Sequence, residues 1–271
     1  MIRPGPQKSR SLQGLLRSPL VDLFQLLLLF LAVAGLFAMG SRDLSYHWQW
    51  YQIPRYLYIH DETGISAGPL LQGLFITLQI SAFSLIAALL IGLVTAVFRL
   101  SASPLAGLLA RLYIEGIRNT PLLIQIFFIY FVLAPLLGLD RLPAAILSLS
   151  LFEGAYIAEI FRSGILSVAR EQHEAAYSLG LSRYATLRHV ILPQAVRTVL
   201  PPLTSQAISL IKDSALVSTI AIYDLTMQAQ SIIAETFLTF EIWLTVAALY
   251  LIVTIALSCL AGALEHRLKL P

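Results

Sequence analysis

Long apolar runs separated by short polar segments predict six membrane-spanning helices. The predicted spans cover residues 20–39, 70–98, 121–139, 142–161, 199–223 and 242–264. They are 19 to 29 residues long, and a helix needs roughly 20 residues to cross the hydrocarbon core of a bilayer. The longest polar interruption, Arg162 to Arg197, contains five arginines and two histidines. We therefore expect one all-α polytopic membrane domain with a large polar loop at residues 162–197.

The composition agrees with a membrane protein. The chain is 58% hydrophobic and 12% charged, whereas soluble domains are about 25% charged. Its single cysteine, Cys259, excludes a disulfide framework and a cysteine-based metal cluster. The net charge of +3 could suggest nucleic acid, but no basic run is interleaved with base-stacking aromatics, so we expect membrane lipid and no nucleic acid.

The distribution of basic residues predicts the orientation. With six spans, 14 Lys and Arg residues lie on the side of the two termini and 3 on the opposite side. The positive-inside rule then places both termini and the polar loop in the cytoplasm, and residues 40–69 outside. Residues 1–19 form a basic cytoplasmic tail. A signal peptide is the alternative for residues 20–39, but this run is longer than the usual ~7–15 residues, which favours a retained span.

The polar loop is predicted to form two short helices. Gln172 to Gly180 can form the first, ended by Gly180, and Ser182 is a suitable N-cap for the second. The second helix is expected to end at Pro193, with Tyr184, Leu187 and Ile191 on one face. From these residues alone, an amphipathic hairpin lying on the membrane surface is an equally good interpretation.

Several segments of the chain, in a fixed order, resemble one known family. Glu174-Ala175-Ala176, Gly180 and the run from Val190 to Pro193 resemble the EAA loop of ATP-binding cassette importer permeases. The resemblance covers most of residues 70–268 and is closest to the polar amino acid branch (histidine, glutamine and glutamate type). The supporting stretches are Gly73 to Ser81, Arg118 to Leu123, Gly154 to Arg162, Leu200 to Leu203 and Lys212 to Leu216. Arg170-Glu171-Gln172 and Ser214-Ala215 depart from the usual Lys-Gly-Gln and Thr-Ser.

The resemblance implies a MetI-like importer transmembrane domain in a bacterial inner membrane. It implies that the loop docks as a coupling helix on a cytoplasmic ATPase dimer and that alternating access follows from ATP-driven movement. The implied coupling residues are Glu174, Ala175, Ala176, Gly180, Leu192 and Pro193. It also implies a second permease subunit, identical or similar, and a periplasmic amino-acid-binding protein that meets the external segments, including residues 40–69.

The chain is not expected to be an enzyme or to bind a cofactor. It has no Gly-x-x-x-x-Gly-Lys-Ser/Thr phosphate loop, so ATP and Mg must be used by the partner ATPase. The alternatives are a membrane-embedded enzyme and a passive channel. All five histidines lie outside the predicted spans, which argues against catalysis, and a passive pore needs no coupling loop.

Polar residues inside the spans are candidates for the substrate path or a gate. Such groups are expensive in a bilayer and usually face a bundle interior or a water-filled path. The candidates are Glu153, Tyr156 and Glu159, which share a face of the fourth span, and Ser209, Lys212 and Asp213 in the fifth. The structural alternative is that Lys212–Asp213 and Glu159–Arg162 are ion pairs that lock helices. Glu153, which belongs to no motif of the family, is the best candidate for substrate choice.

A last group, Arg118, Thr120 and Pro121, lies where a short amphipathic segment turns into the third span. Thr120 is a plausible N-cap and Pro121 suits a first helical turn. Arg118 is expected to brace the inner mouth of the path, and a simple positive-inside anchor is the alternative. The sequence names neither the amino acid that is carried nor the choice between homodimer and heterodimer.

Overall fold

A computed structural model describes residues 21, 23–32, 35, 46–61 and 64–268 of the chain. The chain divides into two compact units, residues 1–49 and 50–271. In the first unit, residues Leu23–Ala32 form an apolar helix with exposed side chains. The predicted tail, residues 1–19, and most of the remaining first predicted span lie outside the described residues.

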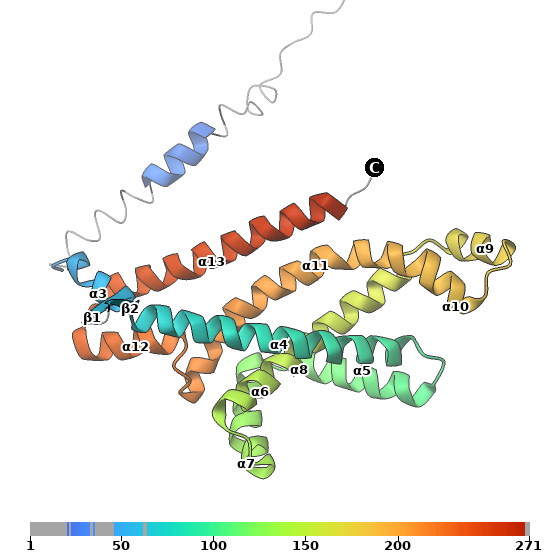
Figure 1. The fold of residues 1–271 in the computed structure, drawn as a ribbon, viewed down its shortest axis with the longest axis horizontal. Helices are drawn as coiled ribbons and strands as arrows, with labels where there is room; N and C mark the ends of the chain where they lie inside the picture. Colours follow the sequence, from blue (N-terminus) through green and yellow to red (C-terminus); the bar gives the residue numbers. More distant parts are fainter. Residues whose placement is uncertain (1–20, 22, 33–34, 36–45, 62–63, 269–271) are drawn as a thin grey trace, which may run out of the picture. The chain divides into compact units, whose positions relative to one another are not determined.

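The second unit is mainly helical (Figure 1). Its elements are, in order, η1 (Trp50–Gln52), α3 (Pro54–Leu57), β1 (Tyr58–Asp61), β2 (Gly64–Ala67), α4 (Pro69–Leu100), α5 (Pro104–Arg118), α6 (Leu122–Phe128), η2 (Ile129–Leu133), α7 (Ala134–Leu137), α8 (Arg141–Leu166), α9 (Arg170–Ser178), α10 (Arg183–Thr186), η3 (Leu187–Ile191), α11 (Leu192–Asp213), η4 (Ser214–Ile220), α12 (Leu225–Thr236) and α13 (Thr239–Leu268). The antiparallel hairpin β1–β2 pairs Tyr58 with Ala67. This hairpin is absent from the all-α prediction.

Helices α4 and α8 form the centre of the unit, and small residues bring them close together. A Cβ atom on Gly92 of α4 would lie 2.6 Å from Ile157 of α8, and one on Gly154 of α8 would lie 2.9 Å from Ile91 of α4. Each glycine thus accepts an isoleucine of the other helix. Because lipid tails are as apolar as the side chains, membrane helices associate through such close packing of small residues.

The predicted count of six spans is not reproduced by the described helices. Helices α4, α8 and α13 are long and apolar enough to cross a membrane, and α5 with the segment Leu122–Leu137 makes a fourth candidate that is bent by 107°. Only 6% of the apolar stretch of α13 is buried, against 56% for α8. Helix α13 therefore presents most of its surface outward, as lipid-facing helices do.

The fifth predicted span, residues 199–223, differs from the observed element. Helix α11 begins at Leu192 and ends at Asp213, where the chain tightens into the 3₁₀ turn η4. The expectation that Pro193 ends the preceding helix is wrong, because α10, η3 and α11 follow one another without a loop. In the π-helical turn η3 the Leu192 N–H bonds to the Leu187 carbonyl, and Pro193 then stands in the first turn of α11, where its missing donor is tolerated.

The segment 224–241, which lies between the fifth and sixth predicted spans, contains helix α12. Asp224 caps this helix, because its Oδ1 accepts a hydrogen bond from the Met227 N–H at 2.8 Å. Asp224 and Glu241 are both fully buried. Both acidic side chains are therefore packed inside the unit.

Candidate functional site

The predicted coupling loop forms two helices, α9 and α10, as the sequence indicates. Gly180 has a φ of +76°, and its N–H bonds to the Tyr177 carbonyl at 2.9 Å, while the Leu181 N–H bonds to the Ala176 carbonyl at 3.1 Å. These two bonds form a Schellman motif, which favours glycine at the left-handed position. Ser182 accepts a hydrogen bond from the Ala185 N–H at 3.2 Å and caps α10. Both boundary predictions, Gly180 and Ser182, are confirmed.

The surface of this hairpin is both charged and apolar. Glu174 of α9 pairs with Arg170 at 2.9 Å, and both side chains are exposed. Ala176 is buried and Ala175 is exposed. Leu179 is 82% exposed and Tyr184 is 68% exposed. Large apolar side chains gathered at an exposed tip are typical of a protein interaction site.

The second part of the site is a polar contact between α8 and α11. Glu153 is 1% exposed, and Gln206 Nε2 donates a hydrogen bond to its Oε2 at 2.6 Å. Glu153 Oε1 has no hydrogen-bond partner among the described residues. The spacing of Gln206 from Ser209 and Asp213 places it on their helical face.

The other predicted residues of the fifth span lie in the last two turns of α11. Asp213 is half-buried and close enough to act electrostatically on Glu153. Lys212 is exposed, and it forms no ion pair with Asp213 in the described part of the chain. The structural alternative in which Lys212 and Asp213 lock each other is therefore absent here. Ser209, also half-buried, lies one turn before Asp213.

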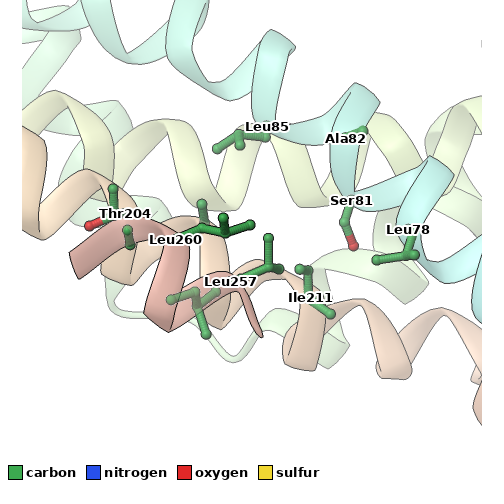
Figure 2. A pocket seen from close by; sticks show the side chains of 11 residues that line it. Leu78, Ser81, Ala82, Leu85, Thr204, Ile211, Leu257 and Leu260 are labelled. Atoms are coloured by element: carbon green, nitrogen blue, oxygen red, sulfur yellow. The ribbon is translucent and has the colours of Figure 1, made fainter. Parts of the chain in front are cut away.

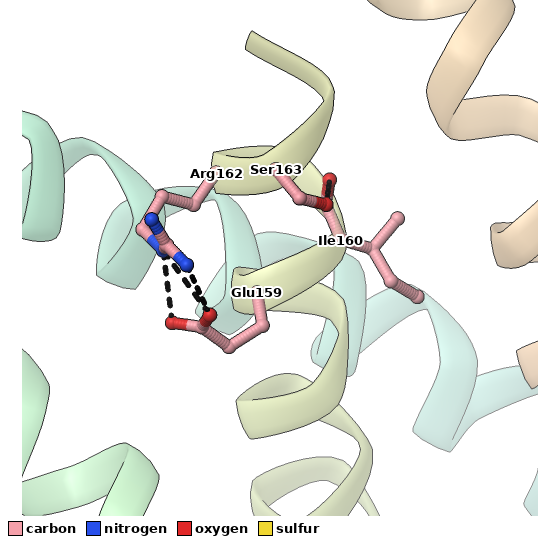
Figure 3. Close-up of polar contacts among 4 residues, drawn as sticks. All are labelled: Glu159, Ile160, Arg162 and Ser163. Atoms are coloured by element: carbon pink, nitrogen blue, oxygen red, sulfur yellow. Dashed lines mark hydrogen bonds and ion pairs between the residues drawn. The ribbon is translucent and has the colours of Figure 1, made fainter. Parts of the chain in front are cut away.

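A second, basic group forms at the end of α8 nearer to α9. Arg162 Nη2 lies 2.8 Å from Glu159 Oε2, and Arg162 Nε bonds to both carboxylate oxygens of Glu159 (Figure 3). The Arg118 guanidinium lies 5.2 Å from the centre of the Tyr156 ring. The Glu159–Arg162 ion pair of the structural alternative is present, but it joins two residues of α8 and not two helices. The predicted polar face of α8 is divided, since Glu153 bonds to α11 while Tyr156 contacts Arg118 of α5.

The bend between α5 and α6 is held by side-chain amides and hydroxyls. Thr120 Oγ1 donates to the Gly116 carbonyl at 2.9 Å, and Gln125 Nε2 donates to Thr120 Oγ1 at 2.7 Å and to the Ile117 carbonyl at 2.8 Å. Thr120 therefore closes the end of α5 and does not cap α6, contrary to prediction. The residue at the N-cap position of α6 is Pro121, which has no side-chain bond. Gln125 was missed by the sequence prediction.

An apolar hollow of about 510 Å³ lies between α4, α11 and α13 (Figure 2). Ser81 and Thr204 are the two polar side chains in its lining, which is otherwise made of leucine, isoleucine and alanine. None of the predicted path residues lines it. Such a surface offers no charged partner for the ammonium or carboxylate group of an amino acid.

Asp224, the cap of α12, is a further buried carboxyl group, and it lies between the fifth and sixth predicted spans. Its Oδ2 has no hydrogen-bond partner among the described residues, and burial raises the pKa of Asp224 to about 6. An aspartate directly before an apolar helical run is an N-cap signal that could have located it. Within the described residues, no cluster of His, Cys, Asp and Glu is arranged to hold a metal ion.

Comparison with known proteins identifies this architecture. The family model described as "Binding-protein-dependent transport system inner membrane component" matches residues 88–270. The glutamine transport system permease protein of Escherichia coli (strain K12) is 44% identical over 204 residues, which are 74% of this chain and 93% of that protein.

Solved structures agree with the sequence comparisons. A crystal structure of an amino acid ABC transporter with histidines superposes with a TM-score of 0.70 at 37% identity, covering 73% of this chain and 94% of that chain. An inward-facing methionine transporter, MetNI, shares the fold with a TM-score of 0.65 at 21% identity, covering 74% of this chain and 97% of that chain.

The class is thus the permease subunit of an ATP-binding cassette importer for amino acids. The chain belongs to the family of inner membrane components of binding-protein-dependent transport systems. Its relatives are transport subunits, so the chain is not itself an enzyme.

Proposed function

We propose that this chain carries polar amino acids across the inner membrane by alternating access, driven by a separate ATPase dimer that binds the α9–α10 hairpin. The observation that carries the proposal is the continuity of α10, η3 and α11. These elements lead without a loop from the exposed hairpin to Gln206, which donates to the buried Glu153. A displacement of the hairpin therefore reaches the polar contact between α8 and α11 through one helical path.

The exposed hairpin supports binding to an ATPase subunit. Glu174, Ala175 and the apolar tip at Leu179 and Tyr184 offer charge, close approach and buried area to a partner groove. Gly180 gives the tight turn between the helices, and Leu192 and Pro193 begin α11. ATP and Mg belong to that partner.

The other partners follow from the family and the topology. The family name includes a binding protein, which is proposed to deliver the substrate at the end of the molecule formed by β1–β2 and α12. A second permease subunit, identical or similar, completes the transmembrane part. The distribution of basic residues supports a cytoplasmic location for the termini and the hairpin.

The substrate path is proposed to pass between α8 and α11. Glu153 has one unpartnered carboxylate oxygen, which suits it to receive an ammonium or guanidinium group. Asp213 and Ser209 extend this polar face along α11, and exposed Lys212 is available for a carboxylate. An inner gate is proposed to include Tyr156, Glu159, Arg162, Arg118, Thr120 and Pro121. The Arg118–Tyr156 contact ties α5 to α8, and Arg162 pairs with Glu159 within α8.

Charge reversal at Glu174 tests the coupling. Glu174→Arg should reduce copurification of the ATPase with the complex, or reduce substrate-stimulated ATP hydrolysis, by about tenfold, because it places a repelling charge at the docking surface. The matched control is the swap Arg170→Glu with Glu174→Arg, which restores the ion pair within α9. If the swap restores activity, Glu174 acts within its own helix. If Glu174→Arg alone binds the ATPase and transports normally, the coupling assignment is wrong.

A further inference from the structure

We propose that the turn between α4 and α5 is a binding site for the headgroup of an anionic phospholipid. A pocket of about 390 Å³ lies at this turn. Its lining contains two arginines and two serines, and no acidic residue. The lining residues used below are Arg99, Ser101, Ser103, Gly107, Leu108 and Arg111. None of these residues takes part in the coupling hairpin or in the polar contact between α8 and α11.

The two arginines have charge to offer. Neither Arg99 nor Arg111 forms an ion pair within the described residues. Glu159, which interacts electrostatically with Arg99, is already paired with Arg162. A guanidinium group presents five donors in a planar fork that suits two phosphate oxygens at once.

The Ser103 hydroxyl can donate a hydrogen bond to the same phosphate group, and the space around the serines is open. Ser103 Oγ accepts a hydrogen bond from the Ala106 N–H at 3.4 Å, so its hydroxyl proton is available. Ser101 Oγ donates to the Phe98 carbonyl at 2.8 Å and so fixes the end of α4. A Cβ atom on Gly107 would meet no atom within 4 Å. The pocket is therefore open at the first turns of α5.

The apolar surroundings favour a lipid over free phosphate. Leu105, Leu108, Leu109 and Leu112 of α5 are between 52% and 66% exposed, and their spacing places them on one face of the helix. The last turns of α4 expose Val97 and Phe98. Acyl chains can lie along these side chains while the phosphate meets the arginines. On the topology proposed above, the pocket opens on the cytoplasmic side, where basic pockets bind anionic headgroups.

Lipid titration of the purified complex tests this site. Native mass spectrometry would follow the binding of dioleoylphosphatidylglycerol, with dioleoylphosphatidylcholine as the zwitterionic comparison. Wild-type protein should retain the anionic lipid preferentially. Arg99→Gln and Arg111→Gln should each weaken its binding by about fivefold, with little effect on phosphatidylcholine. Arg55→Gln, which removes one positive charge at the β1–β2 end of the molecule, is the charge-matched control.

A steric variant separates the pocket from general charge. Gly107→Phe should fill the pocket and reduce binding of phosphatidylglycerol by at least fivefold, while all arginines remain. Gly116→Phe is the matched control, since Gly116 also lies on α5 and has open space around it. Equal effects of the two phenylalanines, or arginine variants no weaker than Arg55→Gln, would overturn the proposal. Glycerol 3-phosphate or inorganic phosphate that competes fully at lipid concentrations would show a free-phosphate site and also contradict it.

Discussion

Glu153 shows how one buried carboxylate can be held between two helices. Its Oε2 is fixed by Gln206, while its Oε1 is buried without a partner among the described residues. An unsatisfied buried oxygen costs stability, and native proteins contain few such groups, some of them with a functional role. Glu153 therefore combines a structural contact to α11 with a free acceptor.

Replacing the charge of Glu153 while keeping its shape tests which role matters. In Glu153→Gln, the amide oxygen can still accept from Gln206, but the negative charge is removed. We expect uptake of a cationic amino acid by the reconstituted complex to fall by about tenfold, equivalent to ~1.4 kcal/mol. Uptake of neutral amino acids should change little. Glu115→Gln, in the exposed part of α5, serves as the control, and equal losses for cationic and neutral substrates would remove Glu153 from substrate choice.

The sequence locates these single residues better than it assigns their partners. Glu153 was predicted because an acid inside an apolar run is rare, and the ion pair of Glu159 with Arg162 follows from helical spacing within α8. The bond from Gln206 to Glu153 joins residues 53 positions apart, and no local pattern determines how α8 and α11 are rotated against each other. Thr120 was misassigned for a different reason: its hydroxyl can bond either to the helix before it or to the helix after it, and the local sequence does not distinguish the two.

At the scale of elements, the close approach of α8 and α11 depends on Gly164. A Cβ atom on Gly164 would collide with Cγ2 of Val199, and Val199 is itself buried. The two helices therefore meet where α8 ends near the coupling hairpin. A larger residue at position 164 must push α11 away or bend it.

Gly164→Ala should destabilise the complex by about 1–3 kcal/mol through overpacking. The midpoint of thermal unfolding of the detergent-solubilised complex measures the effect. Adding Val199→Ala should recover part of the loss, because it removes the colliding methyl group. Gly116→Ala is the matched control, since its surroundings are open and the substitution gains helix propensity. A Gly164→Ala variant as stable as Gly116→Ala would contradict the close approach.

The sequence predicts those elements whose boundaries or apolar character are marked by a local pattern of residues. The apolar runs predict α4, α8 and α13, and Gly180 and Ser182 mark the boundaries of the hairpin. The continuity of α10 with α11 is not predictable from Pro193, because a proline in a first helical turn and a proline after a helix end have the same local sequence. Helix α12 was not predicted, although Asp224 directly before Leu225 is an N-cap signal.

For the whole molecule, the proposed orientation makes the α9–α10 hairpin and the α12 segment face opposite compartments. Single cysteines at the exposed positions Gln172 and Glu235, in a Cys259→Ser background, should test this. In right-side-out vesicles, a membrane-impermeant maleimide should label Glu235→Cys and not Gln172→Cys. Inverted vesicles should give the reverse pattern. Labelling of both positions from one side would refute the proposed topology, and the cysteine-free background controls for non-specific labelling.

The reciprocal packing at Gly92 and Gly154 also has a consequence for biogenesis, because the two helices are synthesised at different times. Helix α4 is synthesised first, but the surface that receives Ile157 is covered only when α8 has left the ribosome. Synthesis of residues 101–166 takes roughly 3–13 s at about 5–20 residues per second. During that interval, the small-residue groove of α4 faces lipid or the insertion machinery. Newly made α4 therefore packs against lipid or the insertion machinery until α8 has been synthesised.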